Sequence, residues 1–433
     1  MKIKFRSSVV LLYFVLIAIQ SQAQKIALEQ AHANGIYQSG EKVILHLSFT
    51  DNAPDSFVLK IWRDFHAAPQ VQKLAYRGPR QLLYNKRFSK PASLIFEVNT
   101  GKDSMKLGAI VDPEHARPGT ALPADFDAYW KAQKQSIHQL PMEAKAVPVA
   151  DNVPEGYRCF SMELNCLGPQ PARGYFARPV NAAPHSLPIV LNLHAAGVAG
   201  DWCRSKTGIA LQYAQMGKGA LSFDLNAHGM LNAQPDSYYD SLERGPLANY
   251  PKQGLENREE NYFHWMYIRL IRTLDYLKAQ PEWDGKRILV IGESQGGGQA
   301  LAAAGLDPAV SAVVATVPAM CDWGQTLQGR KGGWPNPFAE AGDRKKMLAT
   351  LPYFDVAHIL KNAKAKIMVE IGLIDWTCPD LSIYAAINQA KQSEKIVLTA
   401  PYRAHGLEQA RFRDMWRQQI NEPKMEFIKN YLQ

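Results

Sequence analysis

Two patterns of hydrophobic and polar positions divide the chain near residue 115. From residue 35 to residue 111, short runs of β-forming residues are separated by clusters of Gly, Pro and Asn. The runs cover residues 42–49, 56–62, 93–98 and 106–111, and no long amphipathic helix pattern lies between them. Such a pattern is typical of a small antiparallel sandwich of the immunoglobulin-like type. We therefore expect residues 24–115 to form one.

Beyond a Pro-rich joint at residues 112–119, apolar runs alternate with helical patterns. The runs cover residues 189–193, 220–225, 287–291, 310–317, 366–371 and 395–399. Between two of them, apolar residues recur at steps of three and four, which marks the inner stripe of a helix: Phe263, Met266, Leu270, Leu274 and Leu277. Strands that are apolar throughout and separated by helices indicate a mostly parallel sheet covered on both faces. Residues 116–433 are therefore predicted to form a doubly wound α/β domain.

The first 23 residues have the pattern of a secretory signal. Lys2, Lys4 and Arg6 precede an apolar run at residues 9–19, and Ser21-Gln22-Ala23 supplies small residues before a cleavage point at Gln24. The apolar run is shorter than the roughly 20 residues that a membrane-spanning helix needs. We expect a protein that is exported to the periplasm or the cell exterior, without stable membrane insertion.

The composition excludes several classes of protein. With 433 residues, 46% of them hydrophobic and 21% charged, the chain is globular rather than disordered or fibrous. The formal charge of +9 includes three basic residues of the signal segment, and the remainder is spread without long basic runs. A nucleic-acid partner is therefore not expected.

The cysteines give no metal-binding pattern. There are five of them, at spacings that match no zinc site: Cys159, Cys166, Cys203, Cys321 and Cys378. Cys159 and Cys166, on what could be a hairpin, are the one pair close in sequence. They form either a disulfide, which export permits, or two small buried hydrophobic side chains.

A serine with the surroundings of a nucleophile follows the apolar run at residues 287–291. The sequence continues Gly292-Glu293-Ser294-Gln295-Gly296 and then enters an Ala-rich helix pattern. A serine on a tight turn from strand to helix needs small neighbours two positions away on each side, because a Cβ there would collide with the turned backbone. Neither GxxxxGK[ST] nor GxGxxG, the glycine motifs of phosphate loops, is present in this segment. Ser294 is therefore predicted to be a catalytic nucleophile.

A serine hydroxyl needs a histidine base, which in proteins with this elbow follows the nucleophile in the chain. Two histidines do so. His358 lies in a segment, residues 353–360, that is predicted to be helical. His405 lies in a loop just after the apolar run at residues 395–399, where a base can project over the edge of the sheet. His405 is the predicted base.

The acid that orients the base is expected between the two. Asp375 closes the strand predicted at residues 366–371, at the carboxyl end where such sheets place their sites. Asp355 and Asp380 are interpreted as helix caps or surface charges. Ser294, Asp375 and His405 thus form the predicted triad.

Two backbone N–H groups are needed to bind the oxyanion that forms during acyl transfer. One is predicted to belong to Gln295, directly after the nucleophile. The other is predicted to belong to Ala196, in the small-residue segment 194–197 that follows the run at residues 189–193. His194 is interpreted as a hydrogen-bonded wall residue, because no second or third ligand can be paired with it. We expect no metal and no cofactor.

Several ordered motifs resemble one known family. They are residues 124–131 (ADFDAYWK), 292–298 (GESQGGG), 317–322 (VPAMCD), 353–355 (YFD) and 372–375 (GLID), the last followed by Cys378-Pro379. Over residues 120–433 the chain resembles carbohydrate esterase family 7, the acetyl xylan esterases and cephalosporin C deacetylases. The resemblance implies an α/β hydrolase that removes acetyl groups from sugar hydroxyls, with an acetylated oligosaccharide or polysaccharide as substrate.

Three segments depart from the family pattern. Residues 226–229 (NAHG) stand where the family usually has an RGQ motif, Gly406 replaces the acid after the base, and Asp380-Leu381-Ser382 replaces the usual residues after Cys-Pro. None of these changes removes a predicted catalytic group. They leave open the substrate and the oligomeric state, including the family's homo-oligomeric ring.

Substrate contacts and rival functions remain open at this stage. Five residues are candidates for the wall of an acetyl-sized pocket: His194, His228, Trp323, Trp376 and Tyr250. Trp323, Trp376 and Tyr250 could also stack on a sugar ring, and ordinary packing is the favoured interpretation of each. Aromatic residues of the sandwich could stack on sugar rings or fill its core. The rival functions are a serine peptidase of the prolyl oligopeptidase kind and a non-catalytic polysaccharide-binding protein.

Overall fold

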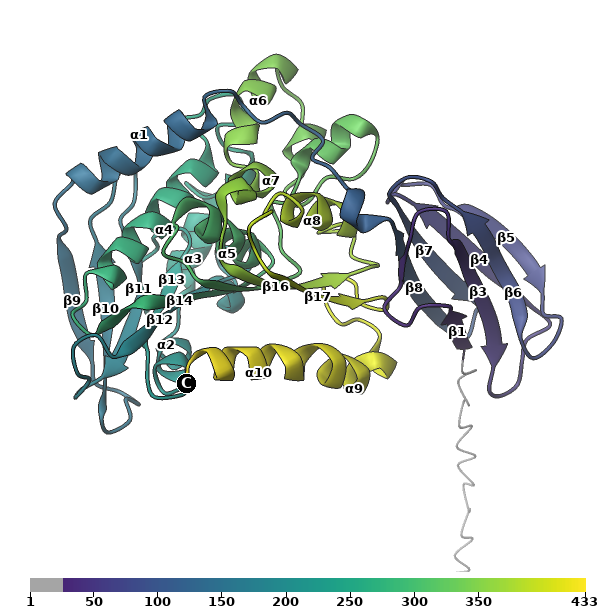
Figure 1. Ribbon diagram of the computed structural model, residues 1–433, viewed down its shortest axis with the longest axis horizontal. Helices are drawn as coiled ribbons and strands as arrows, with labels where there is room; N and C mark the ends of the chain where they lie inside the picture. The colour runs from purple at the N-terminus through teal and green to yellow at the C-terminus, as the bar shows by residue number, and fades with distance from the viewer. Residues whose placement is uncertain (1–25) are drawn as a thin grey trace, which may run out of the picture.

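Two small β-sheets pack face to face at the N-terminal end of the computed structural model, which describes residues 26–433 (Figure 1). One sheet has three strands: β1 (Ile26–Gln30), β3 (Lys42–Phe49) and β6 (Gln81–Arg87). The other has five: β2 (Ile36–Tyr37), β8 (Ser104–Val111), β7 (Ala92–Asn99), β4 (Ser56–Arg63) and β5 (Gln70–Ala75). The predicted signal segment, residues 1–23, lies outside the described residues.

Alternating side chains of the two sheets form the core of this N-terminal sandwich. Leu45 and Leu47 on β3 are completely buried, and the ring of Tyr84 on β6 meets the ring of Phe96 on β7 with centroids 5.0 Å apart. The four strands predicted from the sequence correspond to β3, β4, β7 and β8. The pairing differs from the predicted antiparallel sandwich in one place, because β2 runs parallel to β8.

A nine-stranded sheet occupies the rest of the chain, in the order β17-β16-β15-β14-β12-β13-β11-β10-β9. Its strands are β9 (Ala144–Val149), β10 (Tyr157–Leu164), β11 (Ala172–Pro179), β12 (Leu187–Leu193), β13 (Leu221–Asn226), β14 (Trp283–Glu293), β15 (Ala312–Thr316), β16 (Lys366–Gly372) and β17 (Lys395–Ala400). All pairs from β12 to β17 are parallel, as predicted. Strands β9 to β11, which the sequence pattern did not reveal, add an antiparallel extension.

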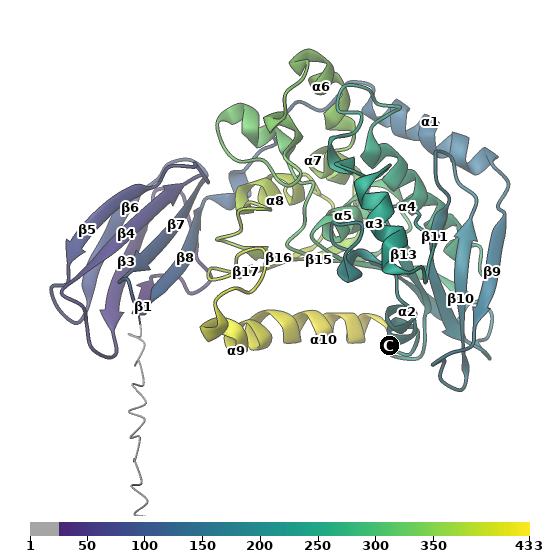
Figure 2. The same ribbon diagram turned by 180° about the vertical axis from the view of Figure 1, so that it is seen from behind.

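Helices cover both faces of this sheet (Figures 1 and 2). On one face lie α1 (Phe126–Gln139), α3 (Asp236–Arg244), α4 (Tyr262–Lys278), α5 (Gln295–Leu306), α6 (Arg344–Thr350), α7 (Val356–Ile359) and α8 (Asp380–Ile387). On the other lie α2 (Thr207–Ala214), α9 (Arg413–Trp416) and α10 (Glu422–Tyr431). The segment predicted as a helix at residues 353–360 is broken into short turns around α7.

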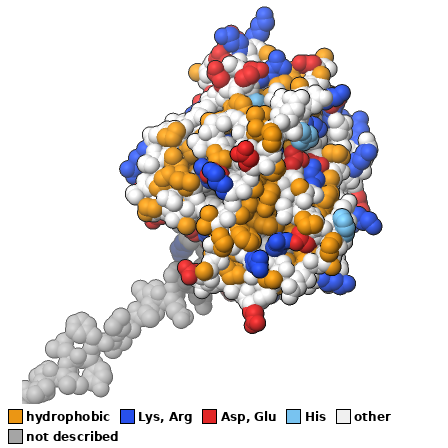
Figure 3. All heavy atoms as spheres, turned by 90° about the vertical axis from the view of Figure 1, so that its left-hand side faces the viewer, with side chains coloured by type: hydrophobic (Ala, Val, Ile, Leu, Met, Phe, Trp, Pro, Cys, Tyr) orange, Lys and Arg blue, Asp and Glu red, His pale blue; other side chains and the backbone are white. Residues whose placement is uncertain are grey.

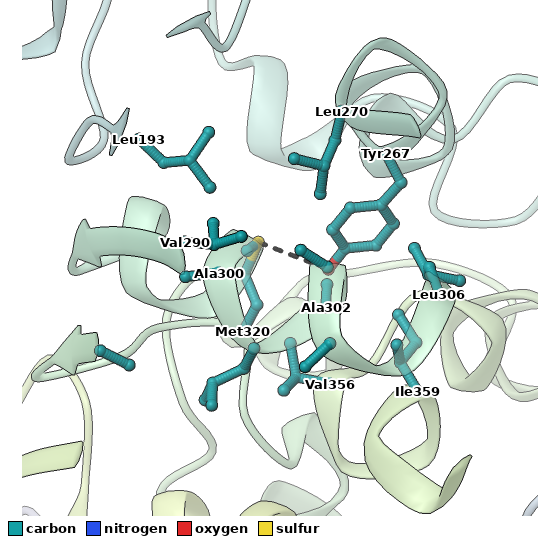
Figure 4. Close-up of a cluster of buried hydrophobic side chains, with 14 of the residues drawn as sticks. Leu193, Tyr267, Leu270, Val290, Ala300, Ala302, Leu306, Met320, Val356 and Ile359 are labelled. Carbon is teal, nitrogen blue, oxygen red and sulfur yellow. Dashed lines mark hydrogen bonds between the residues drawn. The ribbon is translucent and has the colours of Figure 1, made fainter. Parts of the chain in front are cut away.

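Each central strand contributes to two cores, because its side chains point alternately to the two faces. Ile189 and Leu191 of β12 pack under α4 and α5, whereas Val190 between them packs on the face that α10 covers. Figure 4 shows part of the first core, where side chains of α4, α5 and α7 meet those of β12 and β14. The amphipathic stripe predicted from the sequence is the buried face of α4.

The order of the strands changes direction at β12. The chain continues from β12 to one neighbour, β13, and only later places β14 on the other side of β12. In open α/β sheets, ligands bind where the connections diverge in this way. The segments that follow β12 and β14 are those in which the sequence predicts an oxyanion donor and a nucleophile.

A buried charge cluster joins the C-terminal helices to the sheet. Glu370 on β16 has a completely buried side chain, and its carboxylate accepts hydrogen bonds from Arg403 and Lys424. The indole Nε1 of Trp416 donates to the same carboxylate at 2.7 Å. A buried carboxylate needs such partners, because water is not available to solvate it.

All five cysteines are free, so of the two alternatives for Cys159 and Cys166 the disulfide is excluded. Cys159 lies on β10 and Cys166 lies beyond its end, on the same extended segment rather than across a hairpin. Seven residues of extended chain separate their Cα atoms by far more than the roughly 7 Å that a disulfide spans. The alternative interpretation, small buried side chains, holds for Cys159, Cys203, Cys321 and Cys378, while Cys166 is half-buried.

The surface at the β9 end of the sheet mixes apolar and charged side chains (Figure 3). Val147 on the edge strand β9 is 64% exposed. Among residues 26–433, no helix combines the length and the apolar character that crossing a membrane requires.

We predict that Glu370→Gln destabilises the fold by about 3–5 kcal/mol, because it leaves the buried Lys424 without its anion and the buried Arg403 with only the exposed Glu293. The matched control is Glu394→Gln, which breaks an exposed ion pair with Lys366 at the start of the same strand. An exposed pair contributes less than about 1 kcal/mol. Urea unfolding of both variants measures the difference, and equal free energies of unfolding would refute the prediction.

Candidate active site

Ser294 occupies a strained turn between β14 and α5. Its backbone angles are φ 54° and ψ −118°, a combination that residues other than Gly seldom adopt. Neighbouring strands hold the turn, since the Ser294 N–H donates to Thr316 O at 2.9 Å and the Ala319 N–H donates to Ser294 O at 2.9 Å. The turn presents the hydroxyl at the carboxyl edge of the sheet.

Two glycines make this turn possible, as the sequence predicts. A Cβ on Gly292 would lie 2.2 Å from backbone atoms of Gly296, and a Cβ on Gly296 would lie 2.2 Å from Leu193 O. The turn therefore packs directly on the end of β12, with Gly296 also close to the backbone of His194.

The structure brings Ser294, His405 and Asp375 together from three separate loops. His405 Nε2 lies 2.9 Å from Ser294 Oγ, and His405 Nδ1 lies 2.8 Å from Asp375 Oδ2. Asp375 is completely buried, and its other oxygen accepts the backbone N–H groups of Thr377 and Cys378 at 2.8 and 2.9 Å. With Nδ1–H donated to the carboxylate, Nε2 is free to accept a proton from the serine.

The other histidine considered as a base lies elsewhere. His358 is buried in α7, where its Nε2 is 2.9 Å from Thr120 Oγ1. Burial lowers the pKa of His358 to about 4. Asp355 caps α7, as predicted, by accepting the N–H of Ala357 at 2.9 Å.

The loop after β12, which carries Ala196, is held by hydrogen bonds from side chains to its backbone carbonyl groups. Trp202 Nε1 donates to Ala196 O at 2.9 Å, and His228 Nε2 donates to Gly197 O at 2.8 Å. Arg204 donates to Ala199 O. A loop fixed in this way can aim backbone N–H groups at a developing charge before the reaction begins.

His228 lies behind this loop rather than on a substrate wall. Its Nδ1 accepts a hydrogen bond from Tyr262 Oη at 2.5 Å, so both ring nitrogens are engaged by protein groups. Burial, together with the nearby Arg269 guanidinium, lowers the pKa of His228 to about 3 and keeps the ring neutral. The predicted position of His228 in the substrate wall is therefore wrong, and the side chain instead supports the loop after β12 through the Gly197 carbonyl.

His194 is likewise bound by the protein on both sides. Its Nδ1 donates to Trp202 O at 3.2 Å, and its Nε2 lies 2.8 Å from Asp224 Oδ1. Burial disfavours a charge on the ring, but the Asp224 carboxylate outweighs burial and raises the pKa of His194. His194 thus links the end of β12 to β13 and to the backbone of Trp202.

The predicted aromatic wall residues differ from one another. Trp323 has no exposed surface and donates from Nε1 to Trp334 O at 3.3 Å, so a wall position is wrong and the packing interpretation holds. Tyr250 Oη donates to Gln295 Oε1 at 2.5 Å, beside the nucleophile. Trp376, next to Asp375, is half-buried and stays a candidate.

One residue of the site was missed by sequence reasoning. Arg403 Nη2 lies 3.3 Å from Glu293 Oε1 and donates to His405 O at 3.3 Å, while Nη1 bonds the buried Glu370. The Arg403 guanidinium therefore connects Glu293, which precedes Ser294, with the loop that carries His405 and with Glu370 on β16. Its position two residues before His405 was the available signal, but its partners are far away in sequence.

The N-terminal sandwich packs against the loops that carry the acid and the base. The Gly108 N–H on β8 donates to Pro401 O at 2.7 Å, and a Cβ on Gly108 would lie 2.4 Å from Leu373 O. Phe65 and Ile95 of the sandwich form one apolar cluster with residues 374 and 404, the chain neighbours of Asp375 and His405. The sandwich therefore limits how far either loop can move.

A buried polar contact lies in the same interface. Ser93 Oγ donates to Asp380, which is completely buried, so the interpretation of Asp380 as a surface charge is wrong. Its carboxylate also accepts the Leu381 N–H at 2.6 Å and so satisfies one of the N–H groups in the first turn of α8, as a capping residue does. Burial raises the pKa of Asp380 to about 7, against the opposing effect of the Ser93 and Leu381 hydrogen bonds. Of the sandwich aromatics, Tyr37, Phe57 and Tyr84 lie in the sandwich core, as the core interpretation predicts, whereas Phe65 is buried in the interface with the hydrolase loops.

One group of side chains in the described part of the chain has the spacing of a metal site. Ligand atoms of Asp375, Cys378 and His405 lie within 4.8 Å of one another. The Asp375 carboxylate already accepts hydrogen bonds from the Thr377 and Cys378 N–H groups. The hydrogen bond between His405 and Asp375 accounts for their proximity.

Comparisons with known proteins agree on one family. The family model described as acetyl xylan esterase (AXE1) matches residues 112–418. The acetyl esterase Axe7A of Xylanibacter ruminicola is 27% identical over 382 residues, which cover 85% of this chain and 84% of that protein. The structure of an acetyl xylan esterase from Paenibacillus sp. R4 is similar with a TM-score of 0.58 and 26% identity, covering 74% of this chain and 98% of that one.

A second solved structure is similar in fold. Acetyl xylan esterase 1 from Thermoanaerobacterium sp. JW/SL YS485 aligns with a TM-score of 0.54 and 20% identity, over 74% of this chain and 98% of that one. Both solved chains are thus matched almost completely, while about a quarter of the present chain extends beyond either alignment.

We predict that Gly108→Ala slows the reaction of Ser294 with a fluorophosphonate by about 10- to 100-fold, because the added methyl displaces the acid loop at Leu373. Gly208→Ala is the control, since a Cβ on Gly208 in α2 meets no atom within 4 Å. The rate of covalent labelling is measured by mass spectrometry of the intact protein. Wild-type labelling rates in both variants would show that the sandwich does not constrain the site.

Proposed function

The chain belongs to the acetyl xylan esterase family, and from this premise we propose that it is an exported serine esterase that removes acetyl groups from carbohydrate esters. The family makes it a carboxylic ester hydrolase. The observation that carries the proposed mechanism is the hydrogen-bonded series Ser294, His405 and Asp375 at the carboxyl edge of the sheet. The signal-like pattern of residues 1–23 supports export.

In the first step, Ser294 Oγ attacks the carbonyl carbon of the acetyl ester, and His405 Nε2 takes the serine proton. The carbonyl oxygen becomes an oxyanion that accepts hydrogen bonds from the N–H groups of Gln295 and Ala196. The tetrahedral intermediate then collapses. The bond to the sugar oxygen breaks, His405 gives its proton to that oxygen, and the sugar leaves with a free hydroxyl.

In the second step, water clears the acetyl-serine. His405 removes a proton from the water as it attacks, and it returns this proton to Ser294 Oγ as the second intermediate collapses. The bond from the carbonyl carbon to Oγ breaks, and acetic acid leaves and ionises to acetate. Asp375 keeps His405 in the tautomer that accepts at Nε2 and stabilises the imidazolium that forms in each step. Thr377 and Cys378 hold that carboxylate in place through their N–H groups.

The family match favours this activity over the rivals weighed from the sequence. Peptide hydrolysis of the prolyl oligopeptidase kind uses a similar triad, but the matched family and the named relatives are acetyl esterases. A non-catalytic binding protein would have no need of the strained Ser294 turn or of a base within hydrogen-bond distance of it.

We predict that Ser294→Ala or His405→Ala lowers turnover on acetylated xylo-oligosaccharides by about 10⁶-fold, and that Asp375→Asn lowers it by about 10⁴-fold. The three groups act as a unit, so loss of either reacting member removes nearly all of the effect. Acetate release by residues 24–433 is the measurement. Ser136→Ala, on the exposed part of α1, is the control for a serine that should not matter. A folded Ser294→Ala protein that still turns over would overturn the mechanism.

We predict a sharp preference for short acyl groups. Ser294 is 5% exposed, so the acyl group attached to it must fit among packed side chains. The ratio of kcat/KM for 4-nitrophenyl acetate to that for 4-nitrophenyl butyrate should exceed about tenfold, which corresponds to the exclusion of two methylenes from a fitted pocket. Equal rates on the two esters would contradict an acetyl-specific site.

A further inference from the structure

One tryptophan stands apart from the others in the chain. All nine lie within the described residues, and Trp202 is 65% exposed while the remaining eight are buried or half-buried. Trp202 lies in a short turn, Asp201–Cys203, that follows β12. A single exposed apolar side chain is ordinary on a protein surface. Its surroundings distinguish this one.

The Trp202 ring is held in place although it is exposed. Its Nε1–H donates to Ala196 O, and its own carbonyl accepts from His194 Nδ1. The ring lies close against the loop backbone, because a Cβ on Gly200 would lie 2.5 Å from ring carbons and a Cβ on Gly197 would lie 3.1 Å from Nε1. Little conformational freedom is left for a ligand to remove.

The exposed part of the ring has no aromatic or cationic partner among residues 26–433. In contrast, Trp376 meets the rings of Trp62 and Phe65 with centroids 6.1 and 5.3 Å away, and Trp334 meets Tyr250 at 6.3 Å. Trp202 thus presents a flat apolar surface to solvent at a fixed position.

That position borders the acyl-transfer site. The residue whose carbonyl holds the Trp202 indole is Ala196, the proposed second oxyanion donor. The same loop begins at His194, whose backbone packs against Gly296 two residues after the nucleophile. A group bound on Trp202 would therefore lie beside the ester that Ser294 attacks.

We propose that Trp202 is a binding platform for a sugar ring of the acetylated glycan. The proposal rests on the proposed function, because it concerns the carbohydrate part of the same substrate. A pyranose ring has an apolar C–H face that packs on an aromatic ring and hydroxyls at its edge that stay in water, and tryptophan offers the largest such surface. The fixed indole would place the sugar and leave the acetyl group to the buried pocket.

The first experiment compares Trp202→Ala with Trp202→Phe on two substrates, acetylated xylo-oligosaccharides and 4-nitrophenyl acetate. Both variants lose the hydrogen bond to Ala196 O, so any resulting change in the acyl site affects both proteins and both substrates. Only the alanine variant loses the ring. We expect the kcat/KM ratio of oligosaccharide to small ester to fall about tenfold in Trp202→Ala, through KM, and to stay within about threefold of wild type in Trp202→Phe.

The control is Val147→Ala, which removes a similarly exposed apolar side chain from β9 and should leave the ratio unchanged. An unchanged ratio in Trp202→Ala would overturn the platform. An equal fall of the ratio in Trp202→Phe would overturn it as well, because the indole hydrogen bond would then account for the whole effect.

The second experiment separates the platform from the proposed function. Calorimetry measures binding of the acetylated xylo-oligosaccharide to the Ser294→Ala protein, with and without Trp202→Ala. Binding that weakens about tenfold supports the platform, and unchanged binding overturns it. Failure of the wild-type protein to release acetate from the oligosaccharide, while it hydrolyses the small ester, would instead refute the proposed substrate.

Discussion

The buried Glu370 carboxylate constrains the whole C-terminal part of the molecule. It lies on β16 and accepts hydrogen bonds from Arg403, Lys424 and Trp416, so the sheet, the base loop and the last two helices meet at one anion. Arg403 continues the connection to Glu293 and to the carbonyl of His405. The strained Ser294 turn and the loop that carries His405 are thereby both connected, through Arg403, to the same buried carboxylate.

The two halves of the site are stabilised in different ways. Ser294 and the loop that carries Ala196 follow β14 and β12 in the middle of the sheet, where neighbouring strands and the close glycine contacts hold them. Asp375 follows β16 and His405 follows β17, which is the last strand at that edge of the sheet among residues 26–433. The N-terminal sandwich covers that edge, and its Gly108 contacts backbone atoms in both loops. The N-terminal sandwich therefore helps to hold the loops that carry Asp375 and His405 in place.

The parts of the fold and of the site that could be predicted from the sequence depend on residues close together in the chain. Ser294 could be identified because the glycines around it satisfy a requirement that acts within five residues, and the parallel strands could be identified because they are apolar throughout. Strands β5 and β6 escaped notice because polar side chains make up much of their length, so no hydrophobic run marks them. Strand β9 escaped notice because half of its residues are Ala or Pro, which are depleted in strands. The Arg403–Glu370 contact joins residues 33 positions apart, and only the folded sheet brings them together.

The solvent exposure of an individual side chain could not be predicted from the sequence, and it changes the interpretation of the aromatic residues. Trp323, Trp376 and Trp202 carry the same side chain near the same site, yet the first is fully buried, the second half-buried and the third 65% exposed. Burial of an indole needs no explanation beyond the hydrophobic effect. The Trp202 indole stays in water and is fixed by a hydrogen bond to the loop that carries Ala196, the proposed oxyanion donor. Its apolar surface is therefore not buried in the free protein. Such a surface is available to a ligand with an apolar face, and the substrates of acetyl xylan esterases have one.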